Sequence, residues 1–219
     1  MSSLNQAVKK TQKLTVVVEN AFLETIQVRD KYQLLNSDDH HAEMARAKRP
    51  MENARPDIVH QLLLQLFDSP LNKAGLLQVY IRTNQNQIIH INHTTKIPRT
   101  FARFCGLMVQ LLYKHQIRAA ETNEILMRLI AGPITKHLPM NKPVVELEYE
   151  QGSKIVPINE YVQKFKEEDE VVFVIGGFAR GNVEIDYSTE KTAISQYPLS
   201  AAAVAARVTA AFENLWGVI

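Results

Sequence analysis

The stretch that decides the fold lies near the C-terminus, where residues 171–181 read VVFVIGGFARG. Five consecutive apolar residues, four of them β-branched, are typical of a strand buried on both faces. The run stops at Gly176 and Gly177, and Gly181 follows Arg180. Glycines directly after a buried strand let the backbone turn sharply and approach a ligand closely. On composition alone, a plain turn and a ligand-binding loop fit this pattern about equally.

A second segment, residues 193–206, reads AISQYPLSAAAVAA. Tyr197-Pro198 is expected to end a loop, and an alanine-rich helix is expected to begin near Leu199. Ser200 would lie among the free N–H groups at the start of this helix. The spacing G-G-x-x-x-G differs from the dinucleotide fingerprint, and a P-loop also needs a Gly-Lys-Ser/Thr ending. The glycines also come late in the chain, whereas those folds place theirs after the first strand.

Composition describes an ordinary globular chain of 219 residues, 46% hydrophobic and 22% charged, which is enough for one domain. The net charge of +2 means that any surface for nucleic acid must be local. Cys105 is the single cysteine and cannot form an internal disulfide, which fits a reducing compartment. No apolar run approaches the ~18–20 residues of a membrane span. Residues 1–12 are interpreted as a flexible tail, and residues 13–219 as one domain.

Strands that alternate with helices along the chain predict a largely parallel α/β sheet. Residues 77–82 and 88–92 predict a β-hairpin, interpreted as an insertion at about 76–93 that serves as an RNA-gripping arm, an oligomer arm or an edge hairpin. Residues 37–53 are expected to be irregular. Further strands are expected at 14–18, 31–35 and 144–149, with Leu147 central in the last, and helices at 55–68, 96–112, 121–130 and 157–165.

Asp68 ends the helix predicted to begin at Pro56, where the helix dipole disfavours a carboxylate. Function and chance explain this placement equally well, whereas Asp57 is interpreted as a capping residue. The adjacent pair His40 and His41 has no particular ligand geometry, and no Cys/His set at zinc spacing accompanies it. No metal site is therefore predicted.

Arg99 and Arg103 are four residues apart, so on a helix they would lie one above the other, with Lys96 just before them. Such cations can contact successive phosphates or stack on bases, although a solvated basic face has the same pattern.

The segments GGFARG and SQYPLSA resemble the cofactor loops of the SPOUT-class RNA methyltransferases. In particular, the chain resembles the ribosome-biogenesis family that methylates N1 of a pseudouridine in small-subunit ribosomal RNA. The resemblance runs along nearly the whole chain, in order, through the segments YQLLNSDDH, ARPDIVHQLLLQLFDSPLNKAG, IPRTFARFCGLMVQLL and ITKHLP.

This resemblance implies a SPOUT-type α/β fold whose C-terminal trefoil knot involves residues 176–181 and 194–199. It also implies S-adenosylmethionine as the methyl donor, S-adenosylhomocysteine as the product, and a homodimer in the nucleolus that works with pre-rRNA and small-subunit assembly factors. The residues that it assigns to the cofactor are Leu147, Gly176, Gly181, Ile194, Ser195, Gln196, Tyr197, Pro198 and Leu199.

By the same resemblance, Arg55, Lys96, Arg99 and Arg103 contact RNA, although the family commonly has arginine where this chain has Lys96. Methyl transfer from a sulfonium needs two aligned reactants and no covalent nucleophile from the protein. The N1 proton of pseudouridine must leave as the methyl group arrives, so a carboxylate would help. Asp68 is the candidate base or orienting group.

Two alternatives belong to other functional classes. A non-catalytic assembly factor would use the same fold to bind pre-rRNA and would keep the methyl-donor pocket only as a structural relic, a reading that loss of donor binding would support. An unrelated doubly wound enzyme would bind a nucleotide through its phosphates, so NAD or ATP would compete for its site.

Overall fold

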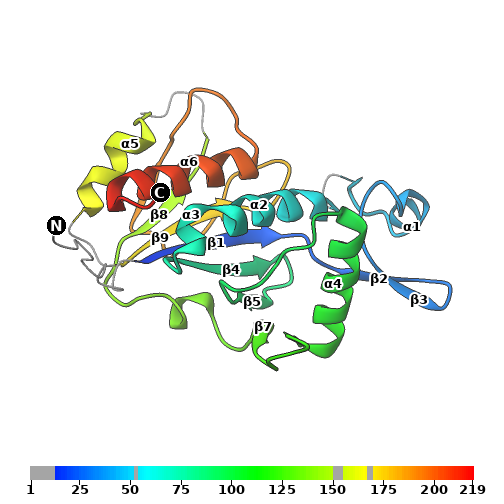
Figure 1. Ribbon diagram of the computed structural model, residues 1–219. Coiled ribbons are helices and arrows are strands. Elements are labelled where there is room, and N and C mark those ends of the chain that lie inside the picture. The colour runs from blue at the N-terminus through cyan, green and yellow to red at the C-terminus, as the bar shows by residue number, and fades with distance from the viewer. Residues whose placement is uncertain (1–12, 52–53, 150–154, 167–169) are drawn as a thin grey trace.

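The computed structural model of the protein describes residues 13–51, 54–149, 155–166 and 170–219. Its centre is a mixed sheet of eight strands (Figure 1). Parallel pairing joins the first five strands in spatial order, and antiparallel pairing adds the last three. The order is β10 (Glu190–Thr192), β8 (Val144–Leu147), β9 (Glu170–Gly176), β1 (Lys13–Ala21), β4 (Leu77–Thr83), β5 (Ile88–Ile91), β7 (Ile125–Ile130) and β6 (Gln116–Arg118).

One face of the sheet is covered by α2 (Pro56–Asp68), α3 (Pro70–Lys73) and α6 (Ala201–Trp216), as Figure 1 shows. Beside α6 lie α5 (Ile158–Tyr161) and η3 (Val162–Phe165), and α4 (Phe101–Lys114) packs at the far end of the sheet beside β6 and β7. The other face carries a smaller apolar cluster, to which η2 (Ile134–Lys136) contributes Ile134. The strands between these two layers are therefore shielded on both sides.

Strand β9 confirms the central prediction, because Val171–Ile175 are all at most 3% exposed. Strand β1 lies against it in parallel register, with Val16 opposite Phe173. The Phe173 ring meets Phe212 of α6 edge to face at 5.4 Å between centroids. Continuous β-branched runs are the pattern of strands covered on both faces, and both runs occupy that position here.

Several predicted elements appear where the pattern placed them. Helix α2 spans Pro56–Asp68 and ends before Pro70, and residues 158–165 are helical. Residues Lys31–Leu34 form β3, which pairs with β2 (Thr25–Val28), a strand that the sequence reading missed. Helix α6 begins at Ala201, and the Ser200 side chain accepts a hydrogen bond from the Ala203 N–H at 3.2 Å.

The helix predicted at residues 121–130 was wrong. Residues 125–130 form strand β7, which pairs with β5 on one side and β6 on the other. Asn123 has a φ of 56°, a left-handed conformation that interrupts a helix just before this run. A short apolar run does not distinguish strand from helix, and pairing on both edges decides for the strand. Residues 37–53 were likewise not all irregular, because α1 (His41–Arg46) forms within them.

The predicted hairpin exists, but it is not an arm inserted on the domain. Strand β4 pairs with β1 over Leu77–Ile81, and β5 pairs with β7, so both hairpin strands lie inside the sheet. A hairpin pattern fixes the pairing of its two strands but not which other strands pair with their outer edges. The hairpin that projects from the body is β2–β3 (Figure 1).

Cys105 provides a test of the packing of α4. This residue is half-buried against the main core, and burial raises the pKa of its thiol to about 11. At pH 8 only about one thiol in a thousand would be a thiolate, the form that reacts with disulfide reagents. We expect slow labelling of the native protein at pH 8, rising steeply towards pH 11, and ordinary labelling in urea. Labelling at pH 8 as fast in the native protein as in urea would contradict this packing.

Candidate functional site

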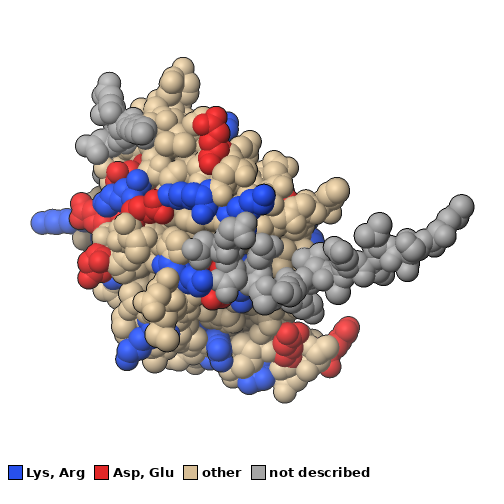
Figure 2. Space-filling view, turned by 90° about the vertical axis from the view of Figure 1, so that its left-hand side faces the viewer, with Lys and Arg blue, Asp and Glu red and all other residues tan. Residues whose placement is uncertain are grey.

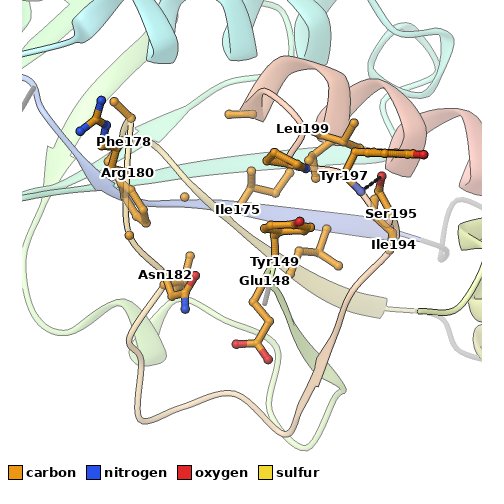
Figure 3. Close-up of a pocket in the computed structure, with 18 residues that line it drawn as sticks. Glu148, Tyr149, Ile175, Phe178, Arg180, Asn182, Ile194, Ser195, Tyr197 and Leu199 are labelled. Atoms are coloured by element: carbon orange, nitrogen blue, oxygen red, sulfur yellow. Dashed lines mark hydrogen bonds between the residues drawn. The ribbon is translucent and has the colours of Figure 1, made fainter. Parts of the chain in front are cut away.

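A cavity of about 420 Å³ opens where β8 and β9 end (Figure 3). The carboxyl ends of parallel strands are the common ligand-binding edge of an α/β sheet. Four segments form its walls: residues 147–149 after β8, residues 175–183 around the glycine loop, residues 194–199, and the first turns of α6. The volume lies in the range of small-molecule sites.

Eight of the nine predicted cofactor residues line this cavity; Gln196 does not. Sequence reasoning missed further lining residues, namely Glu148, Tyr149, Ile175, Phe178, Ala179, Arg180, Asn182, Val183, Ala201 and Val204. Glu148 and Tyr149 directly follow a predicted strand, so the rule that ligands bind at carboxyl strand ends would have found them. Phe178 and Asn182 carried no such signal, because only the folded loop turns them towards the cavity (Figure 3).

Both glycines at the start of the loop are closely packed, and Gly177 is packed against backbone. A Cβ on Gly176 would lie 2.8 Å from the Phe178 ring. A Cβ on Gly177 would lie 2.9 Å from a Val18 methyl and 3.1 Å from the Ala21 backbone. The loop backbone therefore passes directly over the end of β1, and the Gly177 N–H donates to the Glu19 carbonyl at 2.7 Å. This close passage lets main-chain groups form part of the cavity wall.

A second, more polar cavity of about 400 Å³ adjoins the first. The two share Phe178, Gly181, Asn182 and Val183, so the glycine loop is the wall between them. The opposite wall comes from the end of β1 and the β4–β5 turn, with Glu19, Asn20, Arg82, Thr83, Asn84 and Asn86. Hydrogen-bonding side chains line it, which suits a polar ligand.

The loop after the glycines is fixed by buried carboxylates of the sheet. Glu19 accepts a hydrogen bond from the Tyr187 hydroxyl, and Arg82 approaches its other oxygen at 3.3 Å. Glu146, fully buried in β8, accepts from the Ser188 hydroxyl and lies 2.9 Å from the Lys191 ammonium. Burial and the Glu19 carboxylate raise the pKa of Tyr187, so this phenol stays protonated and keeps donating.

Asp68 does not line either cavity. It lies at the C-terminal end of α2, just before α3, where the Leu71 N–H donates to Glu213 near the end of α6. The cavity lies at Ala201, the other end of α6, and the 12 residue steps from Ala201 to Glu213 span about 18 Å. Asp68 instead pairs with Arg99, whose Nη2 is 3.0 Å from Oδ1. Within one chain, the candidate base is thus remote from the cavity.

The candidate RNA-binding cations lie at two places. Lys96, Arg99 and Arg103 are at the start of α4, where Arg99 pairs with Asp68 at the C-terminal end of α2. Arg55 is at the N-terminal end of α2, about 20 Å along that helix from Asp68. The His60 ring of α2 contacts the Pro98 carbonyl at 2.7 Å and stacks on Phe104 at 4.6 Å between centroids. Arg103 is exposed in the first turn of α4, and Lys96 is exposed in the preceding loop. Arg99 precedes α4, so the expected stacking of Arg99 over Arg103 on one helix was wrong: the helix begins only at Phe101.

Arg55 immediately precedes α2 and forms two hydrogen bonds to Asp57, of 2.8 and 2.6 Å. These bonds raise the pKa of Arg55. Asp57 lies in the first turn of α2, where the positive end of the helix dipole stabilises its carboxylate.

Charge on the surface is local, as the near-neutral total predicts. Figure 2 shows Lys and Arg side chains in a band across one side of the molecule, with acidic side chains gathered at one end of that band. Within the described residues, no three His, Cys, Asp or Glu side chains are grouped as metal ligands. The described helices also include none with the length and apolar character needed to cross a membrane.

Comparisons with known proteins point to one family. Residues 16–213 match the family model described as EMG1/NEP1 methyltransferase. A Homo sapiens protein named ribosomal RNA small subunit methyltransferase NEP1 is 47% identical over 208 residues, which cover 95% of this chain and 84% of that protein. A relative of the same name from the archaeon Staphylothermus marinus is 35% identical over 194 residues, covering 85% of this chain and 81% of that protein.

A solved structure shares the fold. The crystal structure of Archaeoglobus fulgidus Nep1 bound to S-adenosylhomocysteine matches with a TM-score of 0.77 at 25% sequence identity. The match covers 94% of this chain and 100% of that chain.

Gly177→Ala tests the close passage of the loop over β1. The new methyl group would press on Val18 and on the Ala21 backbone, and such overpacking costs about 1–3 kcal/mol of unfolding free energy. Gly106→Ala is the matched control, because its Cβ meets nothing within 4 Å inside α4 and should add up to about 1 kcal/mol. Urea denaturation measures both, and equal effects of the two substitutions would contradict the geometry.

Proposed function

The chain belongs to the EMG1/NEP1 methyltransferase family, and we propose that it transfers a methyl group from S-adenosylmethionine to N1 of a pseudouridine in small-subunit ribosomal RNA. The family expected from the sequence is thus confirmed. The observation that carries the proposal is the cavity at the ends of β8 and β9. It gathers eight of the nine residues that family resemblance assigns to the cofactor, from segments some 50 positions apart.

The residues of the first cavity fit this cofactor. Leu147, Ile175 and Leu199 provide apolar walls for an adenine ring, and Tyr197 and Tyr149 stand at its exposed rim. Main-chain groups of the glycine loop and of residues 194–199 would bind the polar parts of the ligand. When bound, the cofactor supplies an electrophilic methyl group, so the chain's own task is to hold and align.

The second cavity is our candidate for the acceptor nucleotide. It adjoins the first through Asn182, so a base placed there would face the donor across the glycine loop. Besides the reacting N1–H, pseudouridine presents two carbonyl acceptors and the N3–H donor. The Asn84 Nδ2 already donates to Glu24, so the buried Asn84 Oδ1 and the Asn182 amide are the groups that can match the base. The target must leave its stack to reach this position, which favours a nucleotide in a single-stranded loop.

Asp68 stays the candidate base or orienting group, acting from a second subunit. Its separation from the cavity within one chain excludes direct contact with a nucleotide bound there. In a homodimer with two-fold symmetry, each subunit can bring the same surface to the other's cavity. We therefore propose that Asp68 of one subunit serves the partner, and that Arg99 releases it when RNA binds.

The RNA would also contact the cations at the start of α4 and at the N-terminal end of α2. Lys96 and Arg103 are exposed there, and Arg55 and Arg99 are already oriented by their carboxylate partners. A phosphate offers these guanidinium groups the same bidentate geometry as a carboxylate. We include in the proposal the trefoil knot formed by residues 176–181 and 194–199, a nucleolar location and a role beside other small-subunit assembly factors.

The first test is transfer of a labelled methyl group to two RNA hairpins that differ only in pseudouridine or uridine at the target. We expect label in the pseudouridine hairpin alone. Ala201→Phe should block the cavity and weaken donor binding at least about tenfold, because overpacking leaves no space for the ligand. Ala202→Phe adds the same ring at the next position, which does not line the cavity, and should bind the donor normally.

Each alternative has its own signature in this assay. Binding of hairpin and donor without any transfer would favour an assembly factor that lacks catalysis. Binding of NAD or ATP, with no binding of the methyl donor, would favour the doubly wound nucleotide enzyme and overturn the cavity assignment.

The second test mixes two inactive variants, Asp68→Asn and Ala201→Phe, after unfolding and refolding them together. If Asp68 serves the partner's cavity, each mixed dimer has one working site, so activity returns to about a quarter of wild type. Each variant refolded alone provides the control for residual activity. No recovery in the mixture, with mixed dimers demonstrated, would mean that Asp68 does not act across subunits.

A further inference from the structure

A row of side chains on the second face of the sheet takes no part in either cavity. Cross-strand register places Tyr80 of β4 opposite His90 of β5, His90 opposite Arg128 of β7, and Arg128 opposite Gln116 of β6. Residues in register on neighbouring strands point to the same face. These four residues, Tyr80, His90, Arg128 and Gln116, are called the cross-strand row.

The row lies on the face away from the main helices. The alternate residues of the same strands, such as Val79, Ile89 and Met127, are buried in the core under α2 and α6. On the row's own face, η2 covers Tyr80 in part, and the His137 ring lies 6.2 Å from the Tyr80 ring. Tyr80 and His90 are half-buried, while Arg128 and Gln116 are exposed. The row is therefore accessible at its β7–β6 end.

The cross-strand row combines two aromatic rings, Tyr80 and His90, with the positive charge of Arg128. The Tyr80 and His90 rings are 5.4 Å apart between centroids. Burial lowers the pKa of His90, and the neighbouring basic side chains, chiefly Arg128, lower it further. His90 is therefore a neutral ring at pH 7, set in a positive local potential. Neutral rings beside cations are the combination that binds bases and phosphates of a single strand.

We propose that the cross-strand row binds a single-stranded RNA segment that flanks the target nucleotide, with bases stacked on Tyr80 and His90 and a phosphate at Arg128. The inference rests on the proposed function, since it takes RNA as the substrate. Adjacent strands are about 4.8 Å apart, so the row offers stacking positions at a spacing that a spread single strand can follow.

A protein partner fits the row less well. The centres of protein interfaces are depleted of charge and carry large apolar anchors. None of the large exposed apolar side chains of the described residues belongs to the row. A duplex would present its phosphates but not the base faces that Tyr80 and His90 suit.

The test compares the pseudouridine hairpin with the same hairpin extended by about eight unpaired nucleotides, placed on either side in separate RNAs. We expect the wild-type chain to bind one extended RNA about tenfold more tightly than the hairpin alone, the size of effect that stacking of one or two bases provides. Arg128→Ala should remove most of this gain. It should also lower the slope of log affinity against log salt by about 0.7, the value for one phosphate contact on a single strand.

Matched variants separate charge, stacking and folding. Arg207→Ala removes an exposed arginine from α6 on the opposite face and should leave the gain intact. His90→Ala should reduce the gain, and His90→Phe should restore it, because a phenyl ring also stacks. Arg128 and Arg207 are both exposed, so both variants are expected to fold normally, which thermal unfolding checks.

The outcomes distinguish this inference from the proposed function. If wild type methylates the hairpin but neither extension increases its affinity, the proposal that the cross-strand row binds RNA is overturned, and the proposed function stands. If the extension increases affinity through Arg128 but no methylation occurs, RNA binding by the cross-strand row is supported and the proposed methyltransferase function is overturned. A dimer that Arg128→Ala dissociates would identify the row as a subunit interface and would also overturn the inference.

Discussion

The parallel pairing of β1 with β9 inside the sheet is the constraint on which the rest of the structure depends. Each strand contains a continuous buried apolar run, Val16–Val18 in β1 and Val171–Ile175 in β9, so the chain gains most by covering both faces of each. That requirement positions α2 and α6 on one side and the residues around η2 on the other. Because β8, β9, β1 and β4 run in the same direction, their carboxyl ends reach one edge together. Both cavities lie at that edge.

The same constraint explains why the glycine loop carries the site. The chain leaves β9 and crosses directly over the end of β1, where a Cβ at position 177 would press on Val18 and on the Ala21 backbone. Beyond the crossing, Glu19 and Glu146 hold the loop through Tyr187 and Ser188. Buried carboxylates are costly unless they are paired, so the hydrogen bonds that satisfy them also fix the cavity wall. The contacts that stabilise the fold at this edge therefore also set the shape of the cavity.

The surfaces for which we propose different roles lie far apart on the fold. The cavities lie at one end of α6, while Asp68 and Arg99 lie towards the other end. The cations near α4 and the cross-strand row belong to further surfaces of the same sheet. An RNA substrate is larger than one subunit's binding edge, so recognition spread over several surfaces fits a folded RNA with unpaired segments. The small donor, in contrast, needs only one cavity.

Local chemistry was enough for much of this protein. Continuous apolar runs determined β1 and β9, and helical periodicity with Pro56 and Pro70 determined α2. These features depend on neighbours in sequence, which a pattern records. The family resemblance carried by the glycine and Tyr197-Pro198 segments, rather than local chemistry, identified eight of the 18 residues that line the first cavity. The strand at 125–130, the place of the β4–β5 hairpin inside the sheet, the pairing of Asp68 with Arg99 and the second cavity were decided only by tertiary structure. Each depends on which distant segment supplies the hydrogen-bond partner or the opposite wall, and no local pattern contains that choice.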